Sequence, residues 1–565
     1  MEESKFFSGS SRIDLWLLLL IIITGAALRF TNFSHSPFTH DEIATVQQVN
    51  HSSVSDVIEK EVKKDVHPAG LFVFVYYWTK LFGTGEQAVK FPFIIFGILS
   101  IALVYLIASK WFNPAAGLLT ASLVSVMQYT IMYSNIARPY ASGLFFSLLM
   151  VYCMTKYFDD ETKRRPLWLS GFVLAASCCA YNHYFSLMFA GIVCATGFLF
   201  VTKKNVTAYF LACISIALLF IPGLLVLAVQ LGYNKGVGGP GGWLDKPDSG
   251  YLLRYIYYVF HYSAVFILLI AFIAVLGLVL KKNFKSRSVW KYRIICLIWF
   301  LLPFTIGYLY SVKINPVLQY SGLIFSFPYF LIFLFSFLSN IKPPLKILFV
   351  VLTLSTGTAT LVYGRNHYEL FCNQGIQKIA DEINSAKQKF GNNSVDAVID
   401  VEDYFFSYYR KRFPFDEHVQ YVSCQENSLR SFMETISKSK ADYFIFATVR
   451  VYPLECMQIV KECFPYTVSE YRGHLTEIFC CAKTPVRQAS EDEPVFISEN
   501  NFTAKVSGWN FPEQKVYSDS LSSKKYFHYE PADEFGVEFQ APLKDLIKSQ
   551  YNWLCATANS TITDT

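Results

Sequence analysis

Charged residues are scarce in this chain of 565 residues: Lys, Arg, Asp and Glu make up 16% of it, whereas hydrophobic residues make up 53%. A soluble domain carries about 25% charged residues, so most of the chain does not face water. The net charge is only +6, which gives no support to a nucleic-acid partner. Disorder, collagen and coiled coil are excluded by the same composition. The composition predicts a polytopic membrane protein.

Several motifs of soluble enzymes are missing. No Cys-x-x-Cys spacing occurs among the 13 cysteines, so zinc and thioredoxin-like chemistry lack support. The glycine-rich segment 232–243 is not followed by Gly-Lys-Ser/Thr, which excludes a nucleotide P-loop and favours a mobile external loop. The tail from residue 365 has no Gly-x-Ser-x-Gly, no metal-type His pair and no dinucleotide fingerprint. We therefore assign no cofactor, and a divalent metal has no support.

Eleven apolar segments have about the length of a membrane-spanning helix. They are 13–33, 88–109, 115–134, 140–157, 167–182, 184–202, 207–231, 262–280, 294–312, 321–339 and 345–364. The first follows Arg12 and has no small-residue cleavage site after it, so we interpret it as a retained anchor. A twelfth apolar stretch, 68–82, is short, opens with Pro68 and contains Lys80. The pattern predicts an α-helical polytopic protein with about eleven spans.

Basic residues in the loops predict the orientation. The loops after even-numbered spans hold fifteen Lys and Arg residues, and the alternate loops hold five. Basic loops stay in the cytoplasm, and Lys5 and Arg12 place the N-terminus there as well. Both assignments hold only if 68–82 lies at the outer interface without crossing. The first external loop (34–87), the short loop 135–139, the loop 232–261 and the tail then lie outside the cytoplasm.

The tail regains the charge density of a soluble domain after residue 365. The segment 376–485 alternates amphipathic helical stretches with β-rich runs such as SVDAVIDV and ADYFIFAT, which predicts an α/β domain. Residues 486–565 carry short strands between turn residues. We therefore expect a transmembrane domain over 1–364, an extracytoplasmic α/β domain over 365–485 and a small β-rich tail domain over 486–565. An accessory or acceptor-binding role is expected for the tail.

Polar residues converge on the predicted outer face. Asp41 and Glu42 begin an amphipathic run just past the first span, and two interpretations of this pair stay open. They are either carboxylates in the first turn of a helix or, for Asp41, a general base at the membrane surface. Further polar residues share this face: His67, Lys90, Arg138 and Tyr140. A lone cation at a helix end often only snorkels, but this combination suits a phosphate leaving group and an incoming hydroxyl.

The order of these residues resembles a known family. An Asp-Glu pair follows the first span, His67-Pro68 opens a non-spanning helix, LFG…E…K precedes a long span, and AR-x-Y follows the next. This pattern, over about residues 13–230, is similar to the C-type glycosyltransferases, and most to bacterial relatives of protein O-mannosyltransferases and the lipid A aminoarabinose transferase. The resemblance implies a multi-span enzyme that uses polyprenyl-phosphate sugars and inverts the anomeric carbon.

The resemblance also implies roles for individual residues. Asp41 matches the catalytic acidic residue, with Glu42 as its neighbour in the catalytic pair. Lys90 stands where the family usually has an arginine near the lipid phosphate, and Arg138 and Tyr140 match the second external loop, so these three are expected to bind the donor phosphate. This chain departs from the family at His67-Pro68-Ala69 and has no acid beside Arg138, which weakens a metal-dependent reading. Further residues expected to line the site are His40, His67, His183, Gln319 and Tyr320.

The sequence therefore predicts a membrane glycosyltransferase of the hexosyl- or pentosyl-transferring, mannosyltransferase-like kind. It would pass a sugar from a polyprenyl-phosphate donor to a hydroxyl of a glycan, lipid or protein acceptor, on the extracytoplasmic face of the inner or plasma membrane. Asp41 would deprotonate the acceptor, while Lys90 and Arg138 stabilise the phosphate. The rival is a transporter or lipid flippase with a substrate-capturing external domain. No internal repeat supports it, and the charges cluster at the outer edge of the membrane, not its middle.

Overall fold

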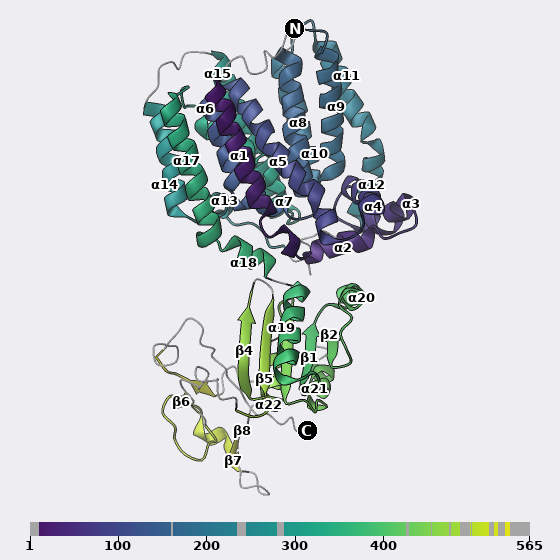
Figure 1. Ribbon diagram of the computed structural model, residues 1–565, viewed down its shortest axis with the longest axis vertical. Coiled ribbons are helices and arrows are strands. Elements are labelled where there is room, and N and C mark those ends of the chain that lie inside the picture. Colours follow the sequence, from purple (N-terminus) through teal and green to yellow (C-terminus); the bar gives the residue numbers. More distant parts are fainter. Residues whose placement is uncertain are drawn as a thin grey trace.

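The computed structural model describes residues 11–159, 162–233, 244–279, 287–373, 375–424, 429–453, 455–473, 476–485, 498, 500–518, 525–528 and 537–542. These residues form a bundle of helices with a smaller sheet-containing domain at one end of it (Figure 1). Residues 234–243 of the glycine-rich segment and most of the tail after residue 485 lie outside the described residues, so the expected mobile loop does too.

The helical bundle follows the apolar segments of the sequence. Its helices are α1 (Arg12–Phe30), α2 (His40–Gln48), α3 (Val54–Asp56), α4 (Gly70–Phe82), α5 (Glu86–Trp111), α6 (Pro114–Val126), α7 (Gln128–Ser134), α8 (Pro139–Asp159), α9 (Arg165–Asn182), α10 (Tyr184–Gly197), α11 (Val206–Leu219), α12 (Ile221–Tyr233), α13 (Tyr251–Val259), α14 (Ala264–Val279), α15 (Arg287–Lys313), α16 (Phe327–Phe335), α17 (Pro343–Ala359) and α18 (His367–Cys372). Short 3-10 or π turns join or extend them: η1 (Phe33–His35), η2 (Val57–Glu61), η3 (Val62–Lys64), η4 (Phe198–Phe200), η5 (Ser321–Phe325) and η6 (Thr360–Gly364).

Candidate spans can be counted in the described part of the chain. Five helices are long and apolar enough to cross a membrane: α1, α5, α8, α15 and α17. Three bent pairs pass the same test together, α6 with α7 at 59°, α11 with α12 at 47° and α13 with α14 at 91°. The chain is therefore an integral, multi-pass membrane protein with five to eight candidate spans. The other three predicted segments form α9, α10 and α16, which are not among these candidates.

Helix α4 occupies the ambiguous stretch 68–82. Its 13 residues are fewer than the roughly 20 that a span needs. Helix α4 lies beside α2 at the end of the bundle that faces the sheet domain (Figure 1). The helix that follows His67-Pro68 therefore lies near α2, the helix that begins with His40.

A buried arginine braces the bend between α6 and α7. The guanidinium of Arg29, 1% exposed in α1, donates to the carbonyl oxygens of Val124 (3.2 Å) and Ser125 (3.1 Å), which are left without helical partners where α6 ends. Its Nε also donates to the Ser134 hydroxyl at the end of α7 (3.1 Å). Arg29 thereby holds the helix that leads into the loop carrying Arg138.

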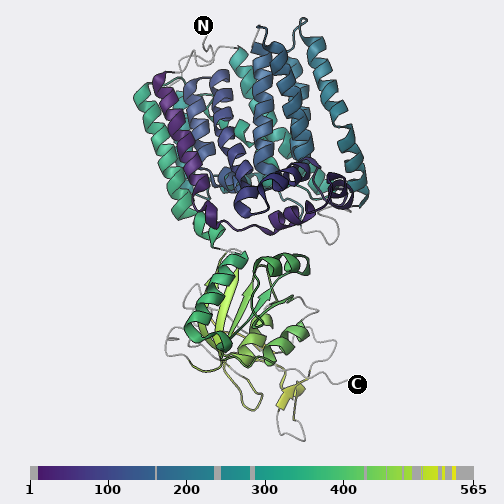
Figure 2. The same cartoon turned by 45° about the vertical axis from the view of Figure 1, so that its right-hand side comes forward.

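The smaller domain is a five-stranded sheet between two layers of helices (Figure 2). Its elements are α19 (Gly375–Phe390), η7 (Asn392–Ser394), β1 (Val395–Asp400), α20 (Asp403–Arg412), β2 (Val419–Val422), α21 (Leu429–Ser437), β3 (Tyr443–Thr448), α22 (Glu455–Cys463), β4 (Tyr466–Arg472) and β5 (Glu477–Ala482). The strand order is β2-β1-β3-β5-β4; β1 pairs parallel with β2 and β3, and β5 pairs antiparallel with β3 and β4. This mixed α/β sheet agrees with the alternation of helical and β-rich runs in the sequence.

The alternation of apolar residues along β1 explains the two helical layers. Ala397 and Ile399 pack in a cluster with α19 and α20, whereas Val398 packs on the other face with α21 and α22. The first cluster continues into the bundle through Ile43 and Val46 of α2. One hydrophobic core thus joins the sheet domain to the helix that begins with His40.

The described part of the tail contains four short strands. β6 (Trp509–Asn510) pairs with β9 (Glu538–Phe539), and β7 (Val516–Ser518) pairs with β8 (Lys525–Phe527), with the turn η9 (Glu513–Lys515) between β6 and β7.

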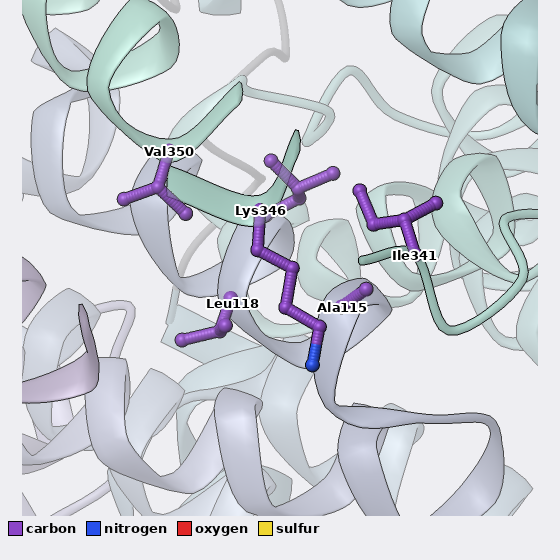
Figure 3. A pocket seen from close by; sticks show the side chains of 6 residues that line it. Ala115, Leu118, Ile341, Lys346 and Val350 are labelled. Carbon is purple, nitrogen blue, oxygen red and sulfur yellow. The ribbon is translucent and has the colours of Figure 1, made fainter. Parts of the chain in front are cut away.

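A small cavity without room for a water molecule lies between α6 and α17 (Figure 3). Lys346 is its one charged lining residue, and its amine donates to Asp14 of α1 at 2.7 Å. This buried ion pair lies near the start of α1 and α17, at the bundle end opposite the sheet domain (Figure 1). The cavity is therefore remote from the predicted site.

Candidate active site

The start of α2 is set by a capping box. Thr39 has extended backbone angles, and its hydroxyl accepts the amide hydrogen of Glu42 at 3.4 Å. In return, the Glu42 carboxylate accepts the Thr39 amide hydrogen at 2.9 Å. This reciprocal pattern satisfies two backbone donors of the first turn. The capping interpretation of the acidic pair therefore applies to Glu42, and Asp41 is left out of it.

Glu42 also ties α2 to two distant segments. Its carboxylate is fully buried, accepts the amide hydrogen of Ala137 at 2.8 Å and lies 3.5 Å from the amine of Lys90. A buried carboxylate is tolerated only with such partners. Glu42 thus fixes the loop before Arg138 against α2 and α5.

The amine of Lys90 is occupied within the protein. Besides Glu42, it donates to the carbonyl oxygen of Pro37 (2.6 Å) and to both the hydroxyl (2.9 Å) and carbonyl (3.3 Å) of Ser36. An ammonium group has three donors, and these acceptors use them all. Lys90 is 1% exposed. The expected contact with a donor phosphate stays a prediction, and the observed role of Lys90 is to hold the segment before α2.

Asp41 is exposed at the N-terminal turn of α2. Among the hydrogen bonds of the described residues, none involves its carboxylate. Its backbone carbonyl accepts a hydrogen bond from the Thr45 hydroxyl at 2.9 Å. The side chain is therefore available to a substrate, as a general base must be.

Arg138 is buried and lacks a carboxylate within ion-pair distance in the described part of the chain. It is 6% exposed, donates from Nη1 to the Thr45 hydroxyl (2.8 Å) and has Nη2 3.3 Å from Nδ1 of His67. Its Nε is buried without a hydrogen-bond partner. Thr45 joins this guanidinium to the backbone of Asp41, so the two predicted site residues share one small network.

Asp65 lies among the predicted site residues, although the sequence reasoning did not select it. Its carboxylate accepts hydrogen bonds from the backbone and Nδ1 of His67, at 2.9 and 2.8 Å, and from Gln48 at 3.2 Å. Burial alone would raise the pKa of Asp65, but the hydrogen bond and charge of His67, the charge of Arg138 and the Gln48 contact hold that pKa well below its usual range. The short Asp-x-His spacing before Pro68 is the signal that could have indicated this pair.

Two aromatic side chains, His183 and Tyr140, continue the site from His67. The ring of His67 lies 5.3 Å from that of His183, and His183 lies 6.2 Å from Tyr140. Nδ1 of His183 accepts the amide hydrogen of Phe185 at 3.0 Å, so it caps α10. Tyr140 is 8% exposed. Arg138 and Asp41 lie close enough to its hydroxyl to interact with it electrostatically. The structure thus brings His67, Arg138, Tyr140 and His183 together.

Gln319 and Tyr320 lie farther along, in a cluster of tyrosines. Adjacent ring centroids 4.5–5.8 Å apart connect Tyr140 to Tyr320 through Tyr133, Tyr129 and Tyr258. Gln319 accepts the Ser321 hydroxyl at 3.3 Å. Arg254, which the sequence reasoning did not select, lies beside the Tyr320 hydroxyl and is about half exposed.

His40 faces the sheet domain. Its ring stacks on Phe405 of α20, with centroids 4.6 Å apart and planes 17° from parallel. Burial lowers the pKa of His40, and the charge of Arg450 acts in the same direction against those of Glu402 and Asp41. His40 is thus a contact between the two parts of the protein, one residue before Asp41.

No group of three or more His, Cys, Asp or Glu side chains suited to a metal ion occurs among the described residues.

Comparisons with known proteins bear on these residues. Residues 66–226 match the family model described as dolichyl-phosphate-mannose-protein mannosyltransferase. This match confirms the predicted resemblance over the segment that holds His67, Lys90, Arg138, Tyr140 and His183. No curated protein matches the chain.

Three solved structures show similarity at low sequence identity. ArnT from Cupriavidus metallidurans in the apo state has a TM-score of 0.48 and 11% identity, over 84% of this chain and 99% of that one. The Archaeoglobus fulgidus oligosaccharyltransferase in the apo form has a TM-score of 0.44 and 12% identity, over 76% and 69%. The S. cerevisiae Pmt1-Pmt2 complex bound to the sugar donor has a TM-score of 0.30 and 15% identity, over 40% and 33%.

Proposed function

We propose that this chain is a membrane glycosyltransferase that moves a sugar from a polyprenyl-phosphate donor to a hydroxyl group of an acceptor on the extracytoplasmic face. The family match over residues 66–226 supports the reaction class. The bundle of apolar helices supports a lipid-linked donor, since such a donor stays in the bilayer. About eleven spans in the C-type arrangement, with the N-terminus in the cytoplasm and the sheet domain outside, belong to the same proposal.

One observation carries the assignment of the site. Arg138 is a buried cation with an unfilled Nε–H and no carboxylate within ion-pair distance among the described residues, and Thr45 links it to the helix that presents Asp41. The Asp65 carboxylate acts on this cation only from beyond ion-pair distance, so a bound anion would stabilise the buried charge further. Glycosyl transfer from a phosphate-linked donor requires a bound phosphate leaving group and, beside it, a carboxylate that is free to act as a base.

The proposed reaction follows from these two groups. The acceptor oxygen attacks the anomeric carbon and forms the new C–O bond, while the Asp41 carboxylate takes the hydroxyl proton. The bond between the anomeric carbon and the phosphate oxygen breaks, and its electron pair stays on the phosphate. Arg138 stabilises that developing charge, with the Tyr140 hydroxyl beside it. Inversion at the anomeric carbon is carried over by resemblance only.

The remaining site residues have supporting roles in this proposal. Glu42 and Lys90 fix the segments that carry Asp41 and Arg138 relative to each other. Glu42 binds the amide of Ala137 before Arg138, and Lys90 of α5 binds Glu42 beside Asp41. Gln319 and Tyr320 line the side from which the lipid donor arrives, along the tyrosine cluster. No step is routed through a metal or cofactor.

The test compares cells that lack the protein with cells that carry the wild type or Asp41→Asn at equal levels. Mass spectrometry of membrane lipids and glycans should show a polyprenyl-phosphate sugar accumulating without the protein and with Asp41→Asn, and a sugar missing from one glycan, lipid or protein. The loss of a general base lowers the rate by about 100- to 10,000-fold. Asp56→Asn, in the same loop, is the matched control and should restore transfer. Full restoration by Asp41→Asn would remove the catalytic assignment.

A further inference from the structure

The edge of the sheet that faces α2 has a strand arrangement that often binds ligands in α/β domains. Strands β1 and β3 are neighbours; the chain leaves the carboxyl end of β1 toward β2 and the carboxyl end of β3 toward β4, in opposite directions along the sheet. In open α/β sheets, ligands bind outside the carboxyl ends of the strands at such a switch point. Helix α20, which follows β1, lies at the end of this domain nearest to α2 (Figure 1). The switch point therefore faces the helix that carries Asp41.

A buried ion pair makes this edge rigid. Asp400, the last residue of β1, is fully buried and takes hydrogen bonds from Arg450 at 2.6 and 3.2 Å. Arg450 also donates to the hydroxyl of Ser423, after β2, at 2.9 Å. Its Nη1 lies 3.9 Å from Glu402, whose side chain remains 49% exposed. One arginine thus fixes the loops after all three parallel strands and leaves the Glu402 carboxylate facing solvent.

The first turn of α20 packs against the first turn of α2. Phe405 stacks on His40, and the charges of Asp41, Glu402 and Arg450 all act on that histidine. One residue before Phe405, Tyr404 keeps 52% of its surface exposed at the junction of the two domains. The charges of Glu61 and Asp65 act on its hydroxyl, so Tyr404 also faces the loop beside the proposed active site.

We propose that Tyr404 and Glu402 form the acceptor subsite and that the acceptor is a glycan. This inference rests on the proposed function and adds the class of its acceptor. An exposed aromatic ring offers an apolar face with a polar tip, which suits the C–H face of a sugar ring. The Glu402 carboxylate accepts a hydrogen bond from one sugar hydroxyl. This contact places another hydroxyl of the glycan at Asp41. The carboxylates of Asp41, Glu61, Asp65 and Glu402 repel phosphorylated or acidic acceptors, which favours a neutral one.

The test measures binding without turnover. Full-length protein in nanodiscs is examined by saturation-transfer NMR with three probes, mannotriose, maltotriose and chitotriose, and with an acetylated Ser/Thr-rich peptide. We expect at least one trisaccharide to bind, and Tyr404→Ala and Glu402→Gln each to lower its affinity by about fivefold. Matched controls in the same domain are Tyr466→Ala, at the start of β4, and Glu434→Gln, on α21; both should bind as wild type.

The outcomes separate this inference from the proposed function. Asp41→Asn should keep trisaccharide binding while it loses transfer, so a failure of the catalytic assignment leaves the binding result intact. The inference is overturned if no trisaccharide binds, if Tyr404→Ala binds all of them unchanged, or if the peptide is the probe that depends on Tyr404. The last result would indicate a protein acceptor.

Discussion

The amine of Lys90 lies 3.5 Å from the carboxylate of Glu42 at a point where the two side chains are 2% and 0% exposed. These residues are 48 positions apart in the sequence. The pair closes the segment before α2 onto α5, and the second oxygen of Glu42 binds the loop before Arg138. The geometry of the proposed site therefore depends on two groups that are themselves shielded from solvent.

Breaking this pair should destabilise the protein. Glu42→Gln leaves the Lys90 ammonium buried without its counter-ion, which costs about 3–5 kcal/mol. We expect a large fall in the unfolding temperature in detergent, and Lys90→Met should cause a similar fall. The double variant should be less destabilised than the sum of the two, since neither charge is then stranded. Additive losses would show that the ion pair is not the stabilising unit.

Arg138 should act on the rate and not on the fold. A charge-assisted contact contributes about 1.5–3 kcal/mol, so Arg138→Ala should lower turnover of a polyprenyl-phosphate sugar by about 10- to 150-fold. Arg138→Lys should recover part of this loss, because it keeps the charge but not the planar fork. The measurement is single-turnover transfer by purified protein, with Arg472→Ala on the sheet domain as control. Wild-type transfer by Arg138→Ala would leave Arg138 as a structural cation.

His40 should make the contact between the two domains sensitive to pH. Its folded pKa is lowered by burial, so its contribution to stability is present above the unfolded value of about 6.5 and is lost as pH falls toward the folded value. Asp41, Glu402 and Arg450 surround the ring, and Phe405 stacks on it. His40→Phe keeps the stack without the titration. The unfolding temperature of the wild type should therefore fall relative to His40→Phe between pH 7 and pH 5; parallel curves would contradict this.

The predicted orientation can be tested with thiol labelling in intact cells. Ser34, in the first predicted external loop, and Lys204, in a predicted cytoplasmic loop, are both exposed. A maleimide that cannot cross membranes should add one label to Ser34→Cys above the background of the native cysteines, and none to Lys204→Cys. Labelling of Lys204→Cys alone would reverse the orientation and place Asp41 on the cytoplasmic side.

Much of the secondary structure was predictable because it depends on local patterns. Each of the eleven apolar segments contains a helix, and the runs SVDAVIDV and ADYFIFAT contain β1 and β3. The bends were not predicted. The segment 115–134 breaks by 59° between α6 and α7, and the break is stabilised by Arg29, 95 residues away from Val124 in the sequence. A hydropathy pattern carries no information on such a remote partner.

Four of the residues predicted for the site lie together in the structure, namely His67, Arg138, Tyr140 and His183, but the surroundings of each predicted residue were not visible in the sequence. The pair Asp41-Glu42 reads as two equivalent carboxylates, yet only Glu42 is buried in the capping box. Lys90 and Arg138 read as two equivalent cations, yet Lys90 is saturated by Ser36, Pro37 and Glu42, while Nε of Arg138 has no partner. The surroundings of Asp65 and the role proposed for Tyr404 depend on segments that only the fold brings beside them.

The sequence by itself determined that this is a membrane protein, where its apolar helices run, and that Asp41, His67, Arg138 and Tyr140 belong to one end of the bundle. Hydrophobic length and the order of charged residues carry that information because the bilayer acts on each segment separately. Only the tertiary structure decided which charges are neutralised internally and which remain available. Pairing of a buried charge depends on the atoms within a few ångströms of it, and at this site those atoms come from α2, α5, the loop before α8 and a separate sheet domain.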